Sequence, residues 1–187
     1  METVVATELD GMTAAEFAKL PEGPPYYQLI NGDLYMSPSP KRKHQELIVN
    51  LVTLIGGFLK KNPIGKIHIA PSDVAVNEHN VFNPDIYFVS NARRNQLTEQ
   101  GCNGAPDLVV EVLSKSTAKL DLGPKREVYA TAGVIEMWVV SPAAQTIDIW
   151  RLQEDATKPA QKFTAKDALA SPILPGLNID LTAVFAE

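Results

Sequence analysis

The chain has 187 residues, of which 45% are hydrophobic and 21% charged, and this suits one globular domain (1–187) with a sizeable core. Cys102 is the only cysteine, which excludes an internal disulfide and a thiolate metal cage and fits a reducing cytoplasm, and no stretch approaches the roughly 20 apolar residues of a membrane span. The formal net charge of −5 argues against tight nucleic-acid binding through an overall basic surface, so such a role would need local positive patches or a bound metal ion.

The N-terminal part of the chain predicts a short helix followed by a hairpin. Within an N-terminal extension of residues 1–25, Thr13 and Glu16 have the spacing of a capping box, which predicts that a helix starts in the segment 13–20. Asn31-Gly32 is the strongest two-residue hairpin signal, and it lies between extended stretches of the segment 26–37.

A long amphipathic helix is predicted over about residues 41–60, at the start of a core that spans 41–152. His44 lies one turn before its apolar stripe; a hydrogen-bonded histidine at a helix start is the simpler interpretation, and a contact with a functional site is the alternative. The best positive patches are Lys41–His44 and Arg93–Arg94, and solvated surface charge is the simpler interpretation of each. The apolar stripe consists of six residues at helical spacing: Leu47, Ile48, Leu51, Leu54, Ile55 and Phe58.

Strand patterns dominate the rest of the core. Pro124 just inside its start and Gly133 just past its end predict a second helix in the segment 123–133. The order of helix, three strands, helix and further strands predicts an α/β (α+β) protein in which helices flank a mixed sheet. The extended segments are 65–76, 80–90 and 105–114 before this helix, and 134–142 and 145–152 after it, around a turn at Pro142.

Glu111 lies inside an apolar strand, where an ionised carboxylate is costly unless a charge, a metal or hydrogen bonds compensate it. Asp107 shares its strand face but lies about 13 Å away, too far to bind the same cation, and is expected to be a turn or capping residue. Asp85 enters the neighbouring apolar segment in the same Pro-Asp context, so the two carboxylates can approach across adjacent strands. Two carboxylates that close favour a cation between them.

Lys125 falls on the apolar stripe of the second predicted helix, so it either extends to the surface or neutralises buried carboxylates. Asp85, Glu111 and Lys125 together describe a two-carboxylate cation site with an ammonium group beside it. That chemistry suits phosphodiester hydrolysis with Mg²⁺ or Mn²⁺. The alternative is a structural ion-pair cluster without a metal.

Four stretches within about residues 10–185 carry a family resemblance: YYQLINGDLYMSPSPKRKHQELIVNL, NPDIYFVS, GAPDLVVEVLSKSTAKLDLGPKREVYATAGVIEMWVVSP and SPILPGL. They closely resemble the bacterial Uma-type putative restriction endonuclease family, formerly a domain of unknown function, in the PD-(D/E)xK nuclease superfamily. The third stretch is the most specific. The resemblance implies a restriction-endonuclease-like α-β-β-β-α-β core, Mg²⁺ as the cofactor with Mn²⁺ as a substitute, and nucleic acid, with DNA favoured, as the substrate.

The resemblance also implies roles for single residues. Asp85 matches the metal-binding aspartate of the superfamily, and Glu111 matches the glutamate of its (D/E)xK element. The lysine of that element would fall at position 113, which is Leu113 here. Uma-type sequences look like a variant in which the lysine has moved to the following helix, where Lys125 matches it. The implied catalytic residues are therefore Asp85, Glu111 and Lys125, with the two carboxylates as metal ligands.

Further positions match the family in a supporting way. Asp73 is an additional candidate ligand, Ser114 and Asp121 are expected to be structural or to support the ligands, and His44 could contact the site. Gln28 stands where family members often have glutamate, so a carboxylate role at this position is lost, although an amide can still accept a hydrogen bond.

Other functions stay open at this point. A non-catalytic nuclease-fold module that binds nucleic acid or a protein fits the negative charge, Leu113 and Gln28. A different metal-dependent hydrolase is a further alternative, because fold does not fix substrate. A homodimer could form through an edge strand in 145–152 or 177–185.

Overall fold

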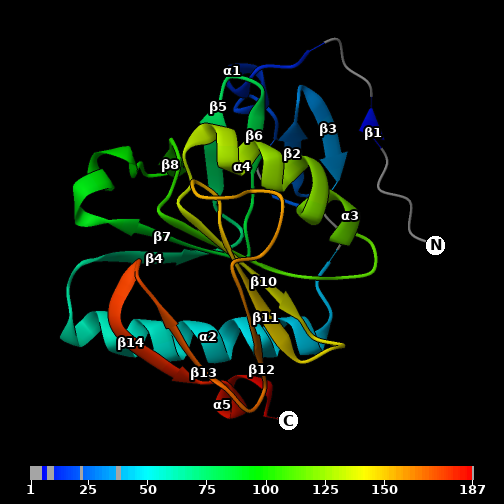
Figure 1. Cartoon of the computed structure of the whole chain (residues 1–187). Coiled ribbons are helices and arrows are strands. Elements are labelled where there is room, and N and C mark those ends of the chain that lie inside the picture. Colours follow the sequence, from blue (N-terminus) through cyan, green and yellow to red (C-terminus); the bar gives the residue numbers. More distant parts are fainter. Residues whose placement is uncertain (1–5, 8–10, 22, 37–38, 187) are drawn as a thin grey trace.

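The computed structural model describes residues 6–7, 11–21, 23–36 and 39–186, and its centre is a six-stranded mixed sheet (Figure 1). The strand order is β12-β11-β10-β9-β7-β4; β9 and β10 run parallel and the other neighbours antiparallel. Nearly all residues of β7, β9 and β10 are buried, so these strands form the middle of the core. The strands are β4 (Gly65–Ile69), β7 (Ile86–Ser90), β9 (Leu108–Val112), β10 (Glu136–Ser141), β11 (Thr146–Arg151) and β12 (Gln161–Thr164).

A second mixed sheet has the order β1-β3-β2-β6-β5-β8. It contains the predicted hairpin, in which Asn31 (φ 53°) and Gly32 (φ 86°) take the left-handed backbone conformation of a tight two-residue turn. A two-stranded sheet pairs β13 (Ala168–Ser171) with β14 (Leu174–Asp180). The strands of the second sheet are β1 (Ala6–Thr7), β2 (Tyr27–Ile30), β3 (Asp33–Met36), β5 (Asp73–Asn77), β6 (Asn80–Phe82) and β8 (Gly101–Asn103).

The two faces of the central sheet are covered differently (Figure 1). The predicted long helix is α2 (Arg42–Lys61), which packs with β13, β14 and α5 (Leu181–Phe185) against one face. The second sheet and α4 (Arg126–Ala132) cover the other face. Strand β9 alternates between these layers as predicted, with Leu108, Val110 and Val112 toward α2. The remaining helices are α1 (Ala14–Phe17), which has the predicted capping box, the 3-10 helix η1 (Asn91–Gln96) and α3 (Ala118–Leu120).

The predicted α-β-β-β-α-β order is present as α2, β4, β7, β9, α4 and β10, but the prediction of one mixed sheet is wrong. The segment 65–76 divides into β4 and β5, and 80–90 divides into β6 and β7, so each segment supplies one strand to each sheet. Pro71 and Pro84 lie in the two breaks. Because proline has no N–H to donate to a strand ladder, pairing stops there and the chain crosses to the other sheet.

The predicted start of the second helix also needs correction. Helical structure begins at Ala118 rather than 123, passes through a π-type turn, η2 (Asp121–Lys125), and bends at Gly123 before α4 begins. Pro124 therefore lies in the turn before α4, where its missing N–H is tolerated. Gly133 ends the helix as predicted, in the left-handed conformation.

One of the two predicted dimer edges is wrong. The segment 145–152 forms β11, which lies between β10 and β12 and has both of its ladders occupied. The segment 177–185 divides into the end of β14, which pairs on one side with β13, and helix α5.

Candidate active site

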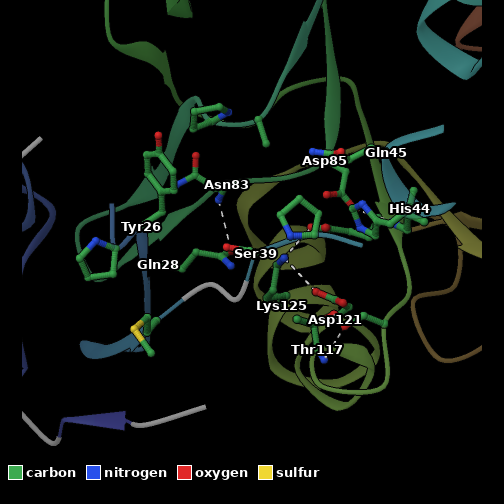
Figure 2. Close-up of a pocket in the computed structure, with 18 of the residues that line it drawn as sticks. Tyr26, Gln28, Ser39, His44, Gln45, Asn83, Asp85, Thr117, Asp121 and Lys125 are labelled. Atoms are coloured by element: carbon green, nitrogen blue, oxygen red, sulfur yellow. Dashed lines mark hydrogen bonds and ion pairs between the residues drawn. The ribbon is translucent and has the colours of Figure 1, made fainter. Parts of the chain in front are cut away.

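A cavity of about 810 Å³ opens at the end of the central sheet, between the start of α2, the π-type turn η2 and the N-terminal hairpin (Figure 2). Asp85, Glu111 and Lys125 all line it. Asp85 lies directly before β7, Glu111 lies in β9 and Lys125 ends η2. The fold therefore brings together the three residues that the sequence singled out.

The register of β7 and β9 places Asp85 beside Glu111. Ile86 pairs with Val110 in this antiparallel ladder, so the next step along the two strands sets Asp85 opposite Glu111. The Oδ2 atom of Asp85 accepts a hydrogen bond from the Val112 N–H at 2.7 Å and lies 3.2 Å from His44 Nε2. The carboxylate of Asp85 is thus held by β9 on one side and by α2 on the other.

Glu111 and Lys125 form a buried ion pair. Lys125 Nζ lies 2.7 Å from Glu111 Oε1 and 2.9 Å from Asp121 Oδ1, and the three residues are only 2–3% exposed. The Tyr129 hydroxyl donates a second hydrogen bond to Glu111 Oε1, at 2.9 Å. Asp121, Lys125 and Tyr129 are spaced four residues apart, so the bent helix from η2 to α4 presents all three to β9.

Burial and excess negative charge perturb the ionisation of this cluster. Burial raises the pKa of Glu111 to about 8; the Lys125 charge opposes this shift, and the charges of Asp121 and Asp85 add to it. Burial alone would lower the pKa of Lys125, but its two carboxylate partners outweigh burial and raise it. For His44, burial lowers the pKa, but the hydrogen bond and charge of Asp85 outweigh it, so the pKa is raised. A bound cation would therefore stabilise the ionised carboxylates of this cluster.

The free oxygens fit a hard divalent cation. Within the described residues, Asp85 Oδ1 and Glu111 Oε2 make no hydrogen bond or ion pair, while the other oxygen of each carboxylate is occupied. No group of three or more His, Cys, Asp or Glu side chains in that same part of the chain is arranged to hold a metal ion. Mg²⁺ is commonly bound by one or two carboxylates, with waters and substrate phosphate completing its shell, so two carboxylates fit it.

Of the other predicted residues, some line the cavity and one does not. Gln28 and Ser114 line it. Gln28 Oε1 accepts the Asn83 N–H, and Ser114 Oγ accepts the Thr117 N–H at the start of the helical segment. Asp73 does not line the cavity, and its Oδ1 accepts a hydrogen bond from the Asn83 side chain, so its geometry does not favour a ligand role.

Two other predictions concern residues that turn out to be structural. Asp107 Oδ2 accepts the N–H of Ser90, the residue before η1, and its Oδ1 lies 3.4 Å from Arg93 Nε, as expected of a capping residue. Arg93 also donates to the backbone oxygens of Ala105, Pro106 and Gly133. Arg93 therefore ties loops together and is not a free positive patch.

Sequence reasoning missed two features of the site. Tyr129 lies on the apolar stripe of the second helix, and its position four residues after Lys125 together with its hydroxyl would have indicated a polar contact with Glu111. The opposite wall of the cavity, which includes Tyr26 and Met36, had no sequence signal, because it depends on how the second sheet packs against the first.

In the described part of the chain, no helix is long and apolar enough to cross a membrane.

Comparisons with known proteins agree with this fold. Over 147 residues, 76% of this chain and 75% of the other, the sequence is 29% identical to an uncharacterized protein of Synechocystis sp.. The crystal structure of a putative nuclease belonging to DUF820 from Anabaena variabilis superposes with a TM-score of 0.78 at 22% identity, covering 94% of this chain and 98% of that one. The family model "Uma2: Putative restriction endonuclease" matches residues 14–182, so the chain belongs to that family.

Proposed function

We propose that this protein hydrolyses phosphodiester bonds in nucleic acid, with DNA as the favoured substrate, and that the reaction depends on Mg²⁺, for which Mn²⁺ can substitute. The observation that carries the proposal is the meeting of Asp85, Glu111 and Lys125 at one wall of one cavity. The family description and the nuclease-like fold support the same reaction class.

Each residue has a distinct task in this proposal. The free oxygens of Asp85 and Glu111 would hold the cation, which supplies polarisation of a phosphate oxygen and a water of lowered pKa. Lys125 orients Glu111 and places an ammonium charge beside the carboxylates, where negative charge develops on the phosphate. His44 fixes the Asp85 carboxylate through its Nε2 atom.

The test is a cleavage assay on single-stranded DNA, duplex DNA and RNA with Mg²⁺ or Mn²⁺. Asp85→Asn and Glu111→Gln should each lower the rate at least about 100-fold, because the loss of a metal ligand removes several kcal/mol of transition-state stabilisation. Glu127→Gln is the matched control, since Glu127 lies on α4 with a 72% exposed side chain and should leave the rate unchanged. Cleavage by both site variants at the wild-type rate would refute the proposal.

One observation favours a second function, a non-catalytic binding module. Lys125 is already bonded to two carboxylates, and such a saturated buried network can be purely structural. In that case the protein would bind nucleic acid or a protein without turnover, and Glu111→Ala would not alter the affinity of the folded protein.

A homodimer, in which two sites could act on both strands of a duplex, would be detected by sedimentation.

A further inference from the structure

Part of the cavity wall that faces the acidic cluster is apolar. Tyr26 and Met36, at the open end of the N-terminal hairpin, line the cavity and remain 44% and 39% exposed. Figure 2 shows Tyr26 across the cavity from His44 and Asp85. Exposed large apolar side chains that gather at one site mark a binding surface more often than scattered ones do. Pro24 and Pro25, directly before Tyr26 in the chain, also line the cavity.

The charges around the cavity limit what can bind there. Its lining contains three carboxylates, of Asp85, Glu111 and Asp121, against Lys125 and His44. Lys125 is already paired with two of these carboxylates and His44 with the third. Duplex DNA is normally held by many Lys and Arg contacts to phosphates, which this lining does not provide. Phosphate contacts from this lining therefore contribute little to the affinity for a nucleic acid, and the apolar wall offers a second source.

We propose that the wall formed by Tyr26, Met36, Pro24 and Pro25 receives an unpaired nucleobase, so that the substrate is a single-stranded or locally unpaired nucleic acid. This inference rests on the proposed function and names its substrate class. A base in an intact duplex has both faces stacked and cannot reach an aromatic ring unless it leaves the stack. The Tyr26 ring offers such a stacking surface, and the cavity volume of about 810 Å³ lies in the range of small-ligand sites.

The position of the wall also fits the reaction. A strand whose base lies against Tyr26 carries its phosphate toward the side of the cavity where Asp85 and Glu111 lie. The base then positions the phosphate, which the acidic cluster would otherwise repel when no cation is bound. Gln45 and Ser39 also line the cavity and supply polar groups at its margin.

The test measures binding and not cleavage. The fluorescence anisotropy of a short labelled oligonucleotide is followed in Ca²⁺ buffer, with gels to verify that the probe stays intact. The probe is used as a single strand, as the same strand annealed to its complement, and as the same strand with one abasic position. Tyr26→Ala removes the ring and Tyr26→Phe retains it. Val49→Ala is the matched control, because Val49 is 61% exposed on α2 and does not line the cavity.

We expect the single strand to bind more tightly than the duplex, and Tyr26→Ala to weaken single-strand binding about 5- to 150-fold, the equivalent of one base stacked on an aromatic ring. Tyr26→Phe and Val49→Ala should bind like the wild type. Equal single-strand affinity of Tyr26→Ala and the wild type, or tighter binding of the duplex, would overturn the inference. If the wild type cleaves nucleic acid but its binding does not depend on Tyr26, only the inference about the nucleobase is refuted. If binding depends on Tyr26 but no cleavage occurs, only the proposed hydrolysis is refuted.

Discussion

Lys125→Met should be among the most destabilising substitutions in this protein. The ammonium group of Lys125 lies 2.7 Å from Glu111 and 2.9 Å from Asp121, and its side chain is only 3% exposed. Methionine has a similar length but no charge, so the substitution leaves two buried carboxylates without their cation. Water replaces the lost partner only in part, because the carboxylate side chains are only 4–5% exposed.

Removing one partner of a buried ion pair costs about 3–5 kcal/mol. For a chain of this size each kcal/mol lowers Tm by about 2–4 °C, so Lys125→Met should lower Tm by about 6–20 °C. Protonation of Glu111 limits the loss, because the variant can neutralise one of its two orphaned carboxylates. Because Lys125 lowers the pKa of Glu111, its loss raises that pKa above about 8, so the two proteins differ in Glu111 ionisation only above that pH and the deficit should be smaller at pH 7 than at pH 9.

Urea unfolding followed by circular dichroism, without divalent ions, measures this free energy directly. The matched control is Lys162→Met, which removes an ion pair of 3.5 Å between Lys162 and Asp148 in which the lysine side chain is 59% exposed. Exposed pairs of this kind contribute less than about 1 kcal/mol. If Lys125→Met cost no more than Lys162→Met, the buried cluster would not be held by Lys125 and the reasoning would be refuted.

Three further predictions concern the surroundings of the site and the fold. Tyr129→Phe should cost about 1–3 kcal/mol in urea unfolding, because it removes a buried hydrogen bond to Glu111; an unchanged midpoint would contradict this. Burial raises the pKa of Glu136, so the folded protein holds this proton at pH values above the ordinary pKa of 4.5, and its stability should fall as pH rises through the raised pKa. Glu136→Gln should therefore flatten the dependence of Tm on pH, and a variant profile parallel to that of the wild type would contradict this prediction. Gly32→Ala should lower the free energy of unfolding by at least about 1–2 kcal/mol, because Gly32 has a φ of +86° and the new Cβ would lie 2.9 Å from Gly11 Cα. A variant that melts at the wild-type Tm would contradict this prediction.

Much of the site was predictable because strand and helix periodicity determine which side chains share a face. Alternation along β9 places Glu111 on the face opposite Val110, and helical spacing aims Lys125 at the same strand. The hairpin at Asn31-Gly32 and the helix end at Gly133 were predictable for a local reason, since each needs a left-handed backbone conformation. The roles assigned to these site residues stay predictions.

The missed features depend on contacts between distant segments. Nothing near Pro71 or Pro84 in the sequence says that the chain crosses to another sheet there, because a strand break and a sheet exchange look alike locally. The bend at Gly123 is another feature that the local helix signals do not show. Asp121 was expected to be structural or to support the ligands, and in the structure it contacts Lys125 directly.

The central claim, a metal-dependent site at Asp85 and Glu111, is tested most directly by a calorimetric titration of the purified protein with Mn²⁺. The wild type should bind saturably, and Asp85→Ala and Glu111→Ala should each abolish binding while circular dichroism shows an unchanged fold. Glu127→Ala, on the exposed face of α4, should bind like the wild type. No binding up to millimolar Mn²⁺, with or without a single-stranded oligonucleotide, would contradict the account and favour a structural ion-pair cluster.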